Sequence, residues 1–504
     1  MSEWGQVEPA AERWNRALVE HAHPPGWRNP APAARYDLVV LGGGTAGLVS
    51  AIVSAGLGAR VALVERHLLG GDCLVSGCVP SKTLLRSARA AADVRAATQF
   101  GVRVPEKVEI DFSAVMERVR RVRAEIAPHD SAKRYSELGI DVFLGHGRFV
   151  DARTLEVAGA RLPFKRAVVA TGARAAPPPI PGLEDCLTNE SVWSLVEQPR
   201  RLAVIGAGPA GCELAQAFAR LGTQVTALEL APQVLIREDP DAAALVAAAL
   251  EQDGVELLLG AKLERVERRG AARVLRVSTA HGPREVEADA VLVAVGRAPN
   301  VEDAGLEAAG IRYDARGVTV DAQLRTSNPR VFAAGDVCLE TKFTHAADAS
   351  AKLVVRNAFF FGRRRAADLV IPWVTYTDPE VAHVGLYERD AHARGIAVDS
   401  FQAPLADNDR ARADGESAGF MKVHVRKGSD AILGATVVAR HAGDLIAPLA
   451  TAMAGGVGLG KLVELVLPYP TQPELIKTVA SAYTRTRLTP LAARVLRGLI
   501  RSKR

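Results

Sequence analysis

Cysteine is scarce in this chain, with five among 504 residues, and three of the five stand alone. The dense cysteine framework of small secreted proteins is absent. The first 35 residues carry several glutamates and no apolar segment, which argues against a signal peptide. The longest uncharged run in the C-terminal part, residues 445–460, contains Pro448 and is too short to span a bilayer. We expect a soluble, cytoplasmic protein of two to four domains.

Net positive charge is absent outside one short segment. The formal net charge is +6, but residues 485–504 hold seven basic and no acidic residues, which leaves −1 for the rest. Nucleic acid is therefore not an expected partner. The same segment spaces its leucines and Val495 as in a basic amphipathic helix. Such a helix makes peripheral contact with an anionic membrane surface, or packs on its own or a partner subunit, and both readings stay open.

The most informative stretch, residues 70–82, holds two cysteines five positions apart, Cys73 and Cys78. On an ideal helix such Cα atoms lie roughly 8 to 9 Å apart, whereas a disulfide needs about 7 Å or less. A bond between them needs a bent backbone, which Gly77 allows. The apolar run that follows predicts that the pair opens a helix, where amides and Lys82 favour a thiolate.

We interpret this pair as a redox-active dithiol whose disulfide is easily reduced. Two buried free thiols are the plain alternative. Half of a zinc site is disfavoured, because no second closely spaced pair of cysteines or histidines completes a tetrahedron, and we expect no bound metal.

Two dinucleotide-binding patterns occur in the chain. In each, an apolar strand leads into G-x-G-x-x-G, a helix, a second strand and a terminal glutamate. The glycines let the turn approach a pyrophosphate at the helix N-terminus, and the acid accepts the ribose hydroxyls. The residues are Gly42, Gly44, Gly47 and Glu65 in the first copy and Gly206, Gly208, Gly211 and Glu229 in the second. Because the dithiol follows the first copy, we assign FAD there and a nicotinamide to the second.

Other strand ends supply further candidate binding residues. Strands near 166–170 and 290–295 end in tight turns, and residues 331–334 are expected to return to the first sheet. Asp336 would set a carboxylate on the ribityl-phosphate side of the flavin, although a plain strand-end turn is the alternative. The candidates in these turns are Thr171, Gly172, Gly296, Gly335 and Asp336.

The order of these motifs resembles the FAD-dependent pyridine nucleotide–disulfide oxidoreductases, the family of dihydrolipoamide dehydrogenase, glutathione reductase and mercuric reductase. The likeness covers roughly residues 36–483, and the cysteine stretch is its most specific element. It implies that Cys78 faces the flavin as a charge-transfer thiolate and that Cys73 exchanges with substrate. It also places Lys82 near flavin N5, paired with Glu213 on the helix after the second fingerprint.

One departure selects a branch of this family. Disulfide reductases place an acid/base histidine five residues before Glu474, where this chain has Tyr469. Tyrosine, with a reference pKa of about 10, is a poor base near neutrality. Mercuric reductases resemble the chain here and in the stretch that begins at Arg237, but this chain lacks their C-terminal cysteine pair and N-terminal Cys-x-x-Cys domain. The resemblance thus implies a mercuric-reductase-like protein without the metal-delivery parts.

The expected function is hydride transfer from NAD(P)H to FAD, then electron transfer to the Cys73–Cys78 disulfide and on to a small thiol-reactive or metal acceptor. The family implies a homodimer in which Tyr469 and Glu474 complete the partner's active site. Glu229 favours NADH because it repels a 2′-phosphate, while the nearby Arg237 would help NADPH. The alternatives are a dihydrolipoyl dehydrogenase and a non-enzymatic, flavin-bearing, membrane-associated partner protein.

The predicted fold class is α/β, with two Rossmann-like FAD/NAD(P)-binding domains and a C-terminal α+β dimerisation domain. A short helix is expected before residue 36, and a long polar helix around 112–136. The predicted parts are an N-terminal extension (1–35), a discontinuous FAD-binding domain (36–165 and 288–365), an NAD(P)-binding domain (166–287), the dimerisation domain (366–484) and a basic amphipathic tail (485–504).

Overall fold

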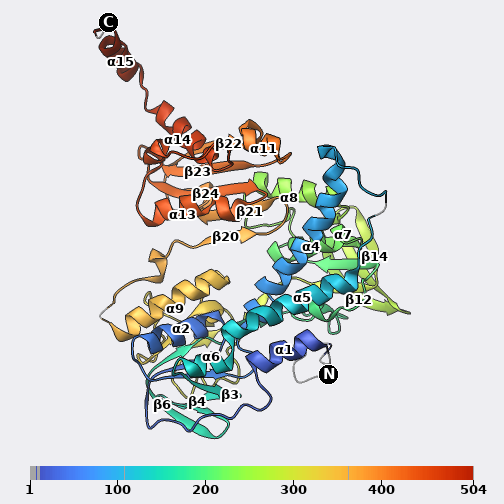
Figure 1. Cartoon of the computed structure of the whole chain (residues 1–504), viewed down its shortest axis with the longest axis vertical. Helices are drawn as coiled ribbons and strands as arrows, with labels where there is room; N and C mark the ends of the chain where they lie inside the picture. Colours follow the sequence, from blue (N-terminus) through green and yellow to red (C-terminus); the bar gives the residue numbers. More distant parts are fainter. Residues whose placement is uncertain (1–6, 8, 10–11, 107, 361, 503–504) are drawn as a thin grey trace. The chain divides into compact units, whose positions relative to one another are not determined.

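The computed structural model describes residues 7, 9, 12–106, 108–360 and 362–502 (Figure 1). The chain forms two compact units, Met1–Pro232 with Asp253–Leu369, and Gln233–Gln252 with Val370–Arg504. Among the described residues, no helix combines the length and the apolarity needed to cross a membrane. The architecture is mixed α/β, as the sequence predicts.

The first unit contains a seven-stranded sheet centred on β1 (Tyr36–Leu41), which pairs in parallel with β2 and β6. Helices α2 (Thr45–Gly56) and α9 (Thr344–Phe359) lie side by side, and their apolar residues join the core beneath β1 (Figure 1). The other strands are β2 (Val61–Glu65), β3 (Asp141–Leu144), β4 (Gly147–Asp151), β5 (Thr154–Val157), β6 (Ala160–Val169) and β19 (Val331–Ala333). Strand β19 pairs with β6, so the chain returns to the first sheet as predicted.

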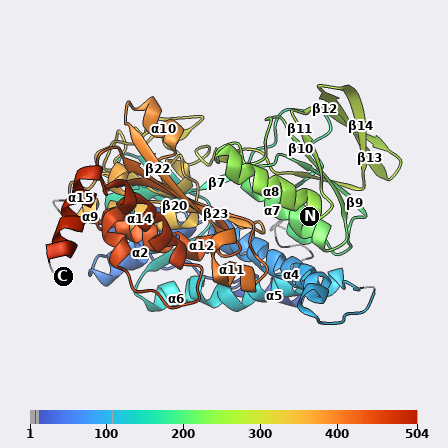
Figure 2. The same cartoon turned by 90° about the horizontal axis from the view of Figure 1, so that it is seen from above.

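A second parallel sheet in the same unit is centred on β9 (Arg201–Ile205), which leads into α7 (Pro209–Arg220). An antiparallel sheet, β12–β13–β14, is inserted in the sequence between β11 and β15 of the parallel sheet (Figure 2). The other strands of the parallel sheet are β8 (Leu187–Thr188), β10 (Gln224–Glu229), β11 (Glu256–Leu259) and β15 (Ala290–Val293), and those of the antiparallel sheet are β12 (Lys262–Arg269), β13 (Ala272–Thr279) and β14 (Gly282–Ala288). Two short two-stranded sheets pair β7 (Ala173–Ala175) with β16 (Arg297–Pro299), and β17 (Tyr313–Asp314) with β18 (Gly317–Val318).

Helices α4 (Cys78–Ala96) and α5 (Phe112–Ile126) run side by side (Figures 1 and 2). The predicted long helix over 112–136 is interrupted: a 3-10 turn, η2 (Ala127–Asp130), separates α5 from α6 (Ala132–Glu137). Pro128 stands in that turn, and the Ser131 side chain accepts a hydrogen bond from a backbone N–H of α6 and caps it. The N-terminal extension forms the expected short helix, α1 (Arg13–Ala22).

The second unit is built on an antiparallel sheet of order β20-β21-β24-β23-β22, packed against helices α13 and α14. Residues 233–252 belong to this unit, because Glu238 accepts hydrogen bonds from Trp373 Nε1 at 2.8 Å and from the hydroxyl of Tyr387. Its elements are α8 (Pro240–Gln252), β20 (Pro372–Thr375), β21 (Glu380–Gly385), α10 (Glu388–Ala393), β22 (Val398–Pro404), α11 (Asp409–Ala413), β23 (Phe420–Arg426), β24 (Ile432–Ala439), α12 (Ala442–Leu445), α13 (Ala447–Ala454), α14 (Glu474–Thr486) and α15 (Pro490–Ser502).

Candidate redox site

The segment from Cys73 to Cys78, here called the redox turn, joins two helices. Cys73 lies on α3 (Gly71–Val75), and Cys78 is the first residue of α4. The prediction that the pair together opens one helix is therefore wrong: only Cys78 does. The backbone bends at Gly77, where a Cβ atom would come 2.8 Å from the carbonyl oxygen of Asp72. The bend predicted from the cysteine spacing is present, and a side chain at residue 77 would obstruct it.

The two cysteines are free thiols whose side chains are hydrogen-bonded to each other. The hydrogen bond from Cys73 lowers the pKa of Cys78 to about 6, helped by Thr344, whose Oγ1 lies 3.3 Å from its sulfur, and by the charge of Lys82. The same hydrogen bond, together with burial, raises the pKa of Cys73. At neutral pH the pair therefore holds one thiolate, at Cys78, and one thiol.

An ion pair holds the first turn of α4. Lys82 Nζ lies 2.8 Å from Glu213 Oε2, and the glutamate side chain is 6% exposed. Glu213 comes from α7, directly after the second glycine fingerprint. The pairing expected from the family resemblance is thus present, and it joins the redox helix to the segment expected to bind the nicotinamide dinucleotide.

A second ionic cluster, which the sequence alone does not indicate, lies beside Cys73. Arg297, on β16, forms ion pairs with Asp72 and with Asp336 Oδ2, the latter at 3.5 Å. Burial opposes the charge on Arg297, but the two carboxylates outweigh it and raise its pKa. Burial also disfavours the charge on Asp336, and because that charge is negative, its pKa rises. The sequence predicts a turn at residues 296–300, and the positive charge of Arg297 within it is the local signal for this cluster.

The first glycine fingerprint forms a tight turn at the N-terminus of α2. A Cβ on Gly42 would come 2.3 Å from Ala170 O, and one on Gly47 would come 1.8 Å from Gly42 O. The carboxylate of Glu65 accepts the N–H groups of Gly43 and His67, and burial raises its pKa. The turn thus leaves backbone N–H groups and an oriented acid at the strand ends, an arrangement that suits a dinucleotide phosphate and ribose.

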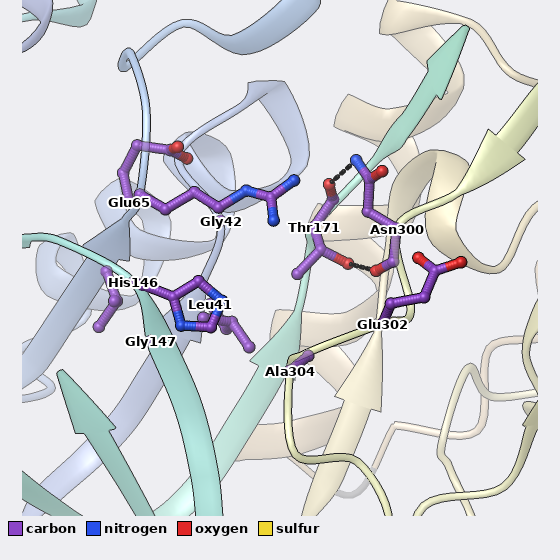
Figure 3. Close-up of a pocket in the computed structure, with 11 residues that line it drawn as sticks. Leu41, Gly42, Glu65, His146, Gly147, Thr171, Asn300, Glu302 and Ala304 are labelled. Carbon is purple, nitrogen blue, oxygen red and sulfur yellow. Dashed lines mark hydrogen bonds between the residues drawn. The ribbon is translucent and has the colours of Figure 1, made fainter. Parts of the chain in front are cut away.

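A solvent-open pocket lies at these strand ends (Figure 3). Thr171 Oγ1 donates to Asn300 O at 2.6 Å, and Asn300 Nδ2 donates to Thr171 O at 2.8 Å, which fixes one wall. The lining residues are Leu41, Gly42, Val64, Glu65, Arg66, His146, Gly147, Thr171, Asn300, Glu302 and Ala304. The cavity fits the adenosine portion of FAD, because an acid, polar groups and apolar strand residues converge there. His146 and Glu302 were not predicted.

The second fingerprint repeats the first. A Cβ on Gly211 would come 1.9 Å from Gly206 O, whereas a Cβ on Gly208 would meet nothing within 4 Å. Glu229 accepts the N–H groups of Ala207 at 2.7 Å and Ala231 at 2.8 Å. The open side at Gly208 is where a second pyrophosphate would approach.

The three predicted turn glycines all have left-handed backbone. Their φ angles are +71° at Gly172, +73° at Gly296 and +76° at Gly335, a region that favours glycine. A Cβ on Gly335 would also come 3.0 Å from the Cβ of Ala46 on α2. The turn before Asp336 therefore lies against the helix of the first fingerprint.

The two predicted C-terminal site residues lie in the second unit. Tyr469 is 71% exposed, and its hydroxyl donates to Asp409 Oδ2 at 2.9 Å. Glu474 begins α14 and accepts the N–H of Thr471 at 3.3 Å. The hydrogen bond to Asp409 raises the pKa of Tyr469. At neutral pH the phenol of Tyr469 therefore keeps its proton and donates a hydrogen bond, as it does to Asp409.

Comparison with known protein families shows the family to which the chain belongs. The model of the pyridine nucleotide-disulphide oxidoreductases matches residues 36–352, and that of their dimerisation domain matches residues 371–480. The chain belongs to the pyridine nucleotide-disulphide oxidoreductase family, as its motifs predict. It is accordingly an FAD-dependent, NAD(P)H-linked oxidoreductase, and the dimerisation domain supports a homodimer.

Relatives of two activities are similar over most of the chain. A mercuric reductase of Lysinibacillus sphaericus is 35% identical over 486 residues, 95% of this chain and 86% of its own length. A dihydrolipoyl dehydrogenase of Geobacillus stearothermophilus is 34% identical over 457 residues, 89% of this chain and 96% of its own. Among solved structures, the Cu(II) complex of the HOCl-induced flavoprotein disulfide reductase RclA from Escherichia coli has a TM-score of 0.78 at 28% identity, covering 89% of this chain and all of that one.

Proposed function

We propose that this protein is an NADH-dependent flavoprotein reductase whose Cys73–Cys78 dithiol passes an electron pair to a thiol-reactive or metal acceptor. The observation that carries the proposal is the pair itself, two hydrogen-bonded cysteines of which Cys78 has a pKa lowered to about 6. Mercuric reductases among the relatives and a Cu(II) complex among the similar structures support a soft-metal or thiol-reactive acceptor.

The chain would hold FAD in the turn at Gly42–Gly47, with Glu65 at the ribose and Asp336 on the ribityl-phosphate side of the flavin. Bound FAD supplies a carrier that takes a hydride from a reduced nicotinamide and gives an electron pair to a disulfide. The second turn, Gly206–Gly211, would hold the nicotinamide dinucleotide. Glu229 would face its ribose, and its negative charge favours NADH over NADPH.

The dithiol step uses only the chain's own sulfurs. The Cys78 thiolate and the Cys73 thiol lose one proton and two electrons and form one S–S bond, while the acceptor takes the two electrons. Cys73 would make the first contact with the acceptor, and Lys82 stabilises the thiolate of Cys78 from one helical turn away. Tyr469 and Glu474 of the partner subunit would complete the acceptor site, with the tyrosine as donor.

An anaerobic titration with NADH and with NADPH, followed by an acceptor panel of Hg(II), Cu(II), lipoamide, glutathione disulfide and a quinone, tests this proposal. We expect NADH to reduce the enzyme at lower concentration and Hg(II) or Cu(II) to be the preferred acceptors. Cys73→Ser should keep its flavin and lose the dithiol-dependent acceptors, while Cys186→Ser should match the wild type. A Cys73→Ser protein that reduces every acceptor at the wild-type rate refutes the disulfide role.

The dihydrolipoyl dehydrogenase relative motivates a second candidate activity. Tyr469 disfavours it, because an exposed tyrosine with a raised pKa cannot take a proton from a substrate thiol near neutrality. Tyr469→His should raise the rate of lipoamide exchange if the position has the role that the resemblance implies. Rapid lipoamide turnover by the unmodified protein would select the second activity instead.

We also propose that the C-terminal helix α15 touches an anionic membrane surface. Its large apolar side chains and the adjoining leucine are each at least 49% exposed: Leu488, Leu491, Val495, Leu496, Leu499 and Ile500. Residues 485–504 add seven basic and no acidic residues, which suits anionic headgroups. This contact would leave the enzyme's redox chemistry unchanged, and it would place the enzyme at the membrane surface when it binds its acceptor.

Co-sedimentation with anionic and with zwitterionic vesicles tests the membrane contact. We expect binding to anionic vesicles only, with a loss at high salt, and loss on deleting residues 485–504. Replacing Leu491, Val495 and Leu499 by glutamine keeps the charge and should also abolish binding. Unchanged vesicle binding by the truncated protein would refute the membrane contact. Conversion of a dimer to a monomer on truncation would instead assign the tail to subunit contact. Bleaching of the flavin by NADH would exclude a purely non-enzymatic membrane partner.

A further inference from the structure

Two carbonyl groups between the cysteines are held by side chains from distant parts of the sequence. Arg123 Nη1, on α5, donates to Val75 O at 2.7 Å. Trp193 Nε1, on the 3-10 turn η3 (Val192–Ser194), shares its single N–H between Asn189 O at 2.7 Å and Ser76 O at 3.0 Å. Both donor side chains are buried, with Arg123 0% and Trp193 1% exposed. The bend of the redox turn is therefore fixed from outside the turn.

Arg123 is itself held by the N-terminal extension. Its Nη2 donates to Asn15 Oδ1 on α1 at 2.9 Å, and Asn15 is 1% exposed. Asn15 Nδ2 donates in turn to Pro9 O at 3.0 Å. Glu12, the cap of α1, lies 3.7 Å from the buried Arg120, one turn before Arg123. A buried guanidinium needs such partners, and this one finds them in a segment that precedes the family match at residue 36.

The chemistry of the contact suits the end of α3. Val75 is the last residue of that helix, where carbonyl groups carry partial negative charge. Burial lowers the pKa of Arg123 to about 10, so the guanidinium stays charged at neutral pH. A charged donor makes a stronger hydrogen bond than a neutral one. Removing it should loosen the turn at the point where the chain passes from Cys73 to Cys78.

We propose that Arg123, Asn15 and Trp193 are positioning residues for the dithiol, and that α1 is a working part of the redox centre. The proposal rests on the redox role of the cysteine pair argued above. By fixing the redox turn, these side chains keep the two sulfurs within reach of each other in the reduced protein. Confinement raises the effective concentration of one thiol at the other and so favours the disulfide.

The disulfide–dithiol equilibrium of the full-length holoenzyme in glutathione redox buffers measures this effect. In the exchange, the Cys78 thiolate and the Cys73 thiol give two electrons and one proton to glutathione disulfide, and solvent supplies the second proton, which yields one protein disulfide and two glutathione thiols. Alkylation and mass spectrometry of the peptide spanning residues 67–82 report the oxidised fraction. For Arg123→Met we expect the equilibrium constant for disulfide formation to fall about tenfold, a rise of about 30 mV in reduction potential.

Two further variants test the same proposal if the Arg123→Met protein fails to fold. Trp193→Phe removes the N–H donor together with part of the buried ring, and Asn15→Leu removes the acceptor on α1; both should shift the equilibrium in the same direction. Arg13→Ala, which breaks an exposed α1–α5 ion pair with Glu117, is the matched control and should leave it unchanged.

Three results would overturn the proposal. One is a lower melting temperature in Trp193→Phe and Asn15→Leu with the wild-type equilibrium, which makes the contacts structural only. Another is a shift toward the disulfide. The third is a wild-type protein that forms no Cys73–Cys78 disulfide in any buffer, which removes the proposed redox function itself and is distinguishable from the first two.

Discussion

Breaking the ion pair between Lys82 and Glu213 tests how the redox helix is stabilised. The Nζ–Oε2 distance is 2.8 Å, with the glutamate side chain 6% and the lysine side chain 36% exposed. Two unit charges at that separation attract by about 6 kcal/mol at an effective dielectric constant of about 20. Desolvation of the glutamate and partial hydration of the lysine offset most of this, so we expect a coupling free energy of about 1–2 kcal/mol.

A double-mutant cycle of Lys82→Met and Glu213→Gln, followed by chemical unfolding of the holoenzyme, measures that coupling. The exposed pair Lys133–Glu137, four residues apart on α6 with Nζ 3.7 Å from Oε1, is the matched control. It should yield about 0.5 kcal/mol or less. Lys82→Met should also raise the pKa of Cys78, because the lysine charge favours the thiolate. A coupling no larger than that of the control refutes the reasoning.

Three other outcomes follow from the geometry. As the pH falls, the thiolate–flavin absorbance of the reduced enzyme should be lost with a midpoint near pH 6, because the lowered pKa keeps Cys78 ionised above that value. A midpoint near the ordinary thiol value of about 8.5 would contradict this. Gly77→Ala, whose Cβ would lie 2.8 Å from Asp72 O, should cost about 1–3 kcal/mol in unfolding free energy. Gly56→Ala on α2, with nothing within 4 Å, should be neutral or should stabilise the protein by up to about 1 kcal/mol. Gly47→Ala should weaken FAD retention about tenfold or more, and a normal flavin-to-protein ratio would count against the assigned turn.

Much of the fold could be predicted because its signals are local. Each glycine fingerprint lies within about thirty residues of its strand, helix and acid, and the structure builds both turns with the acid accepting backbone N–H groups. The bend at Gly77 followed from cysteine spacing and helix geometry alone. The prediction of one continuous helix over 112–136 was wrong for a local reason as well. Pro128 and the Ser131 cap interrupt a run that is helical by composition.

By itself the sequence determined the two nucleotide turns, the dithiol and the family, since each depends on residues close together along the chain. Only the tertiary structure decided what surrounds the sulfurs. Arg297 meets Asp72 across 225 positions, and Trp193 meets Ser76 across 117. No local pattern marks such partners, because a buried charge or indole N–H is satisfied by whatever group the packing brings within hydrogen-bonding distance.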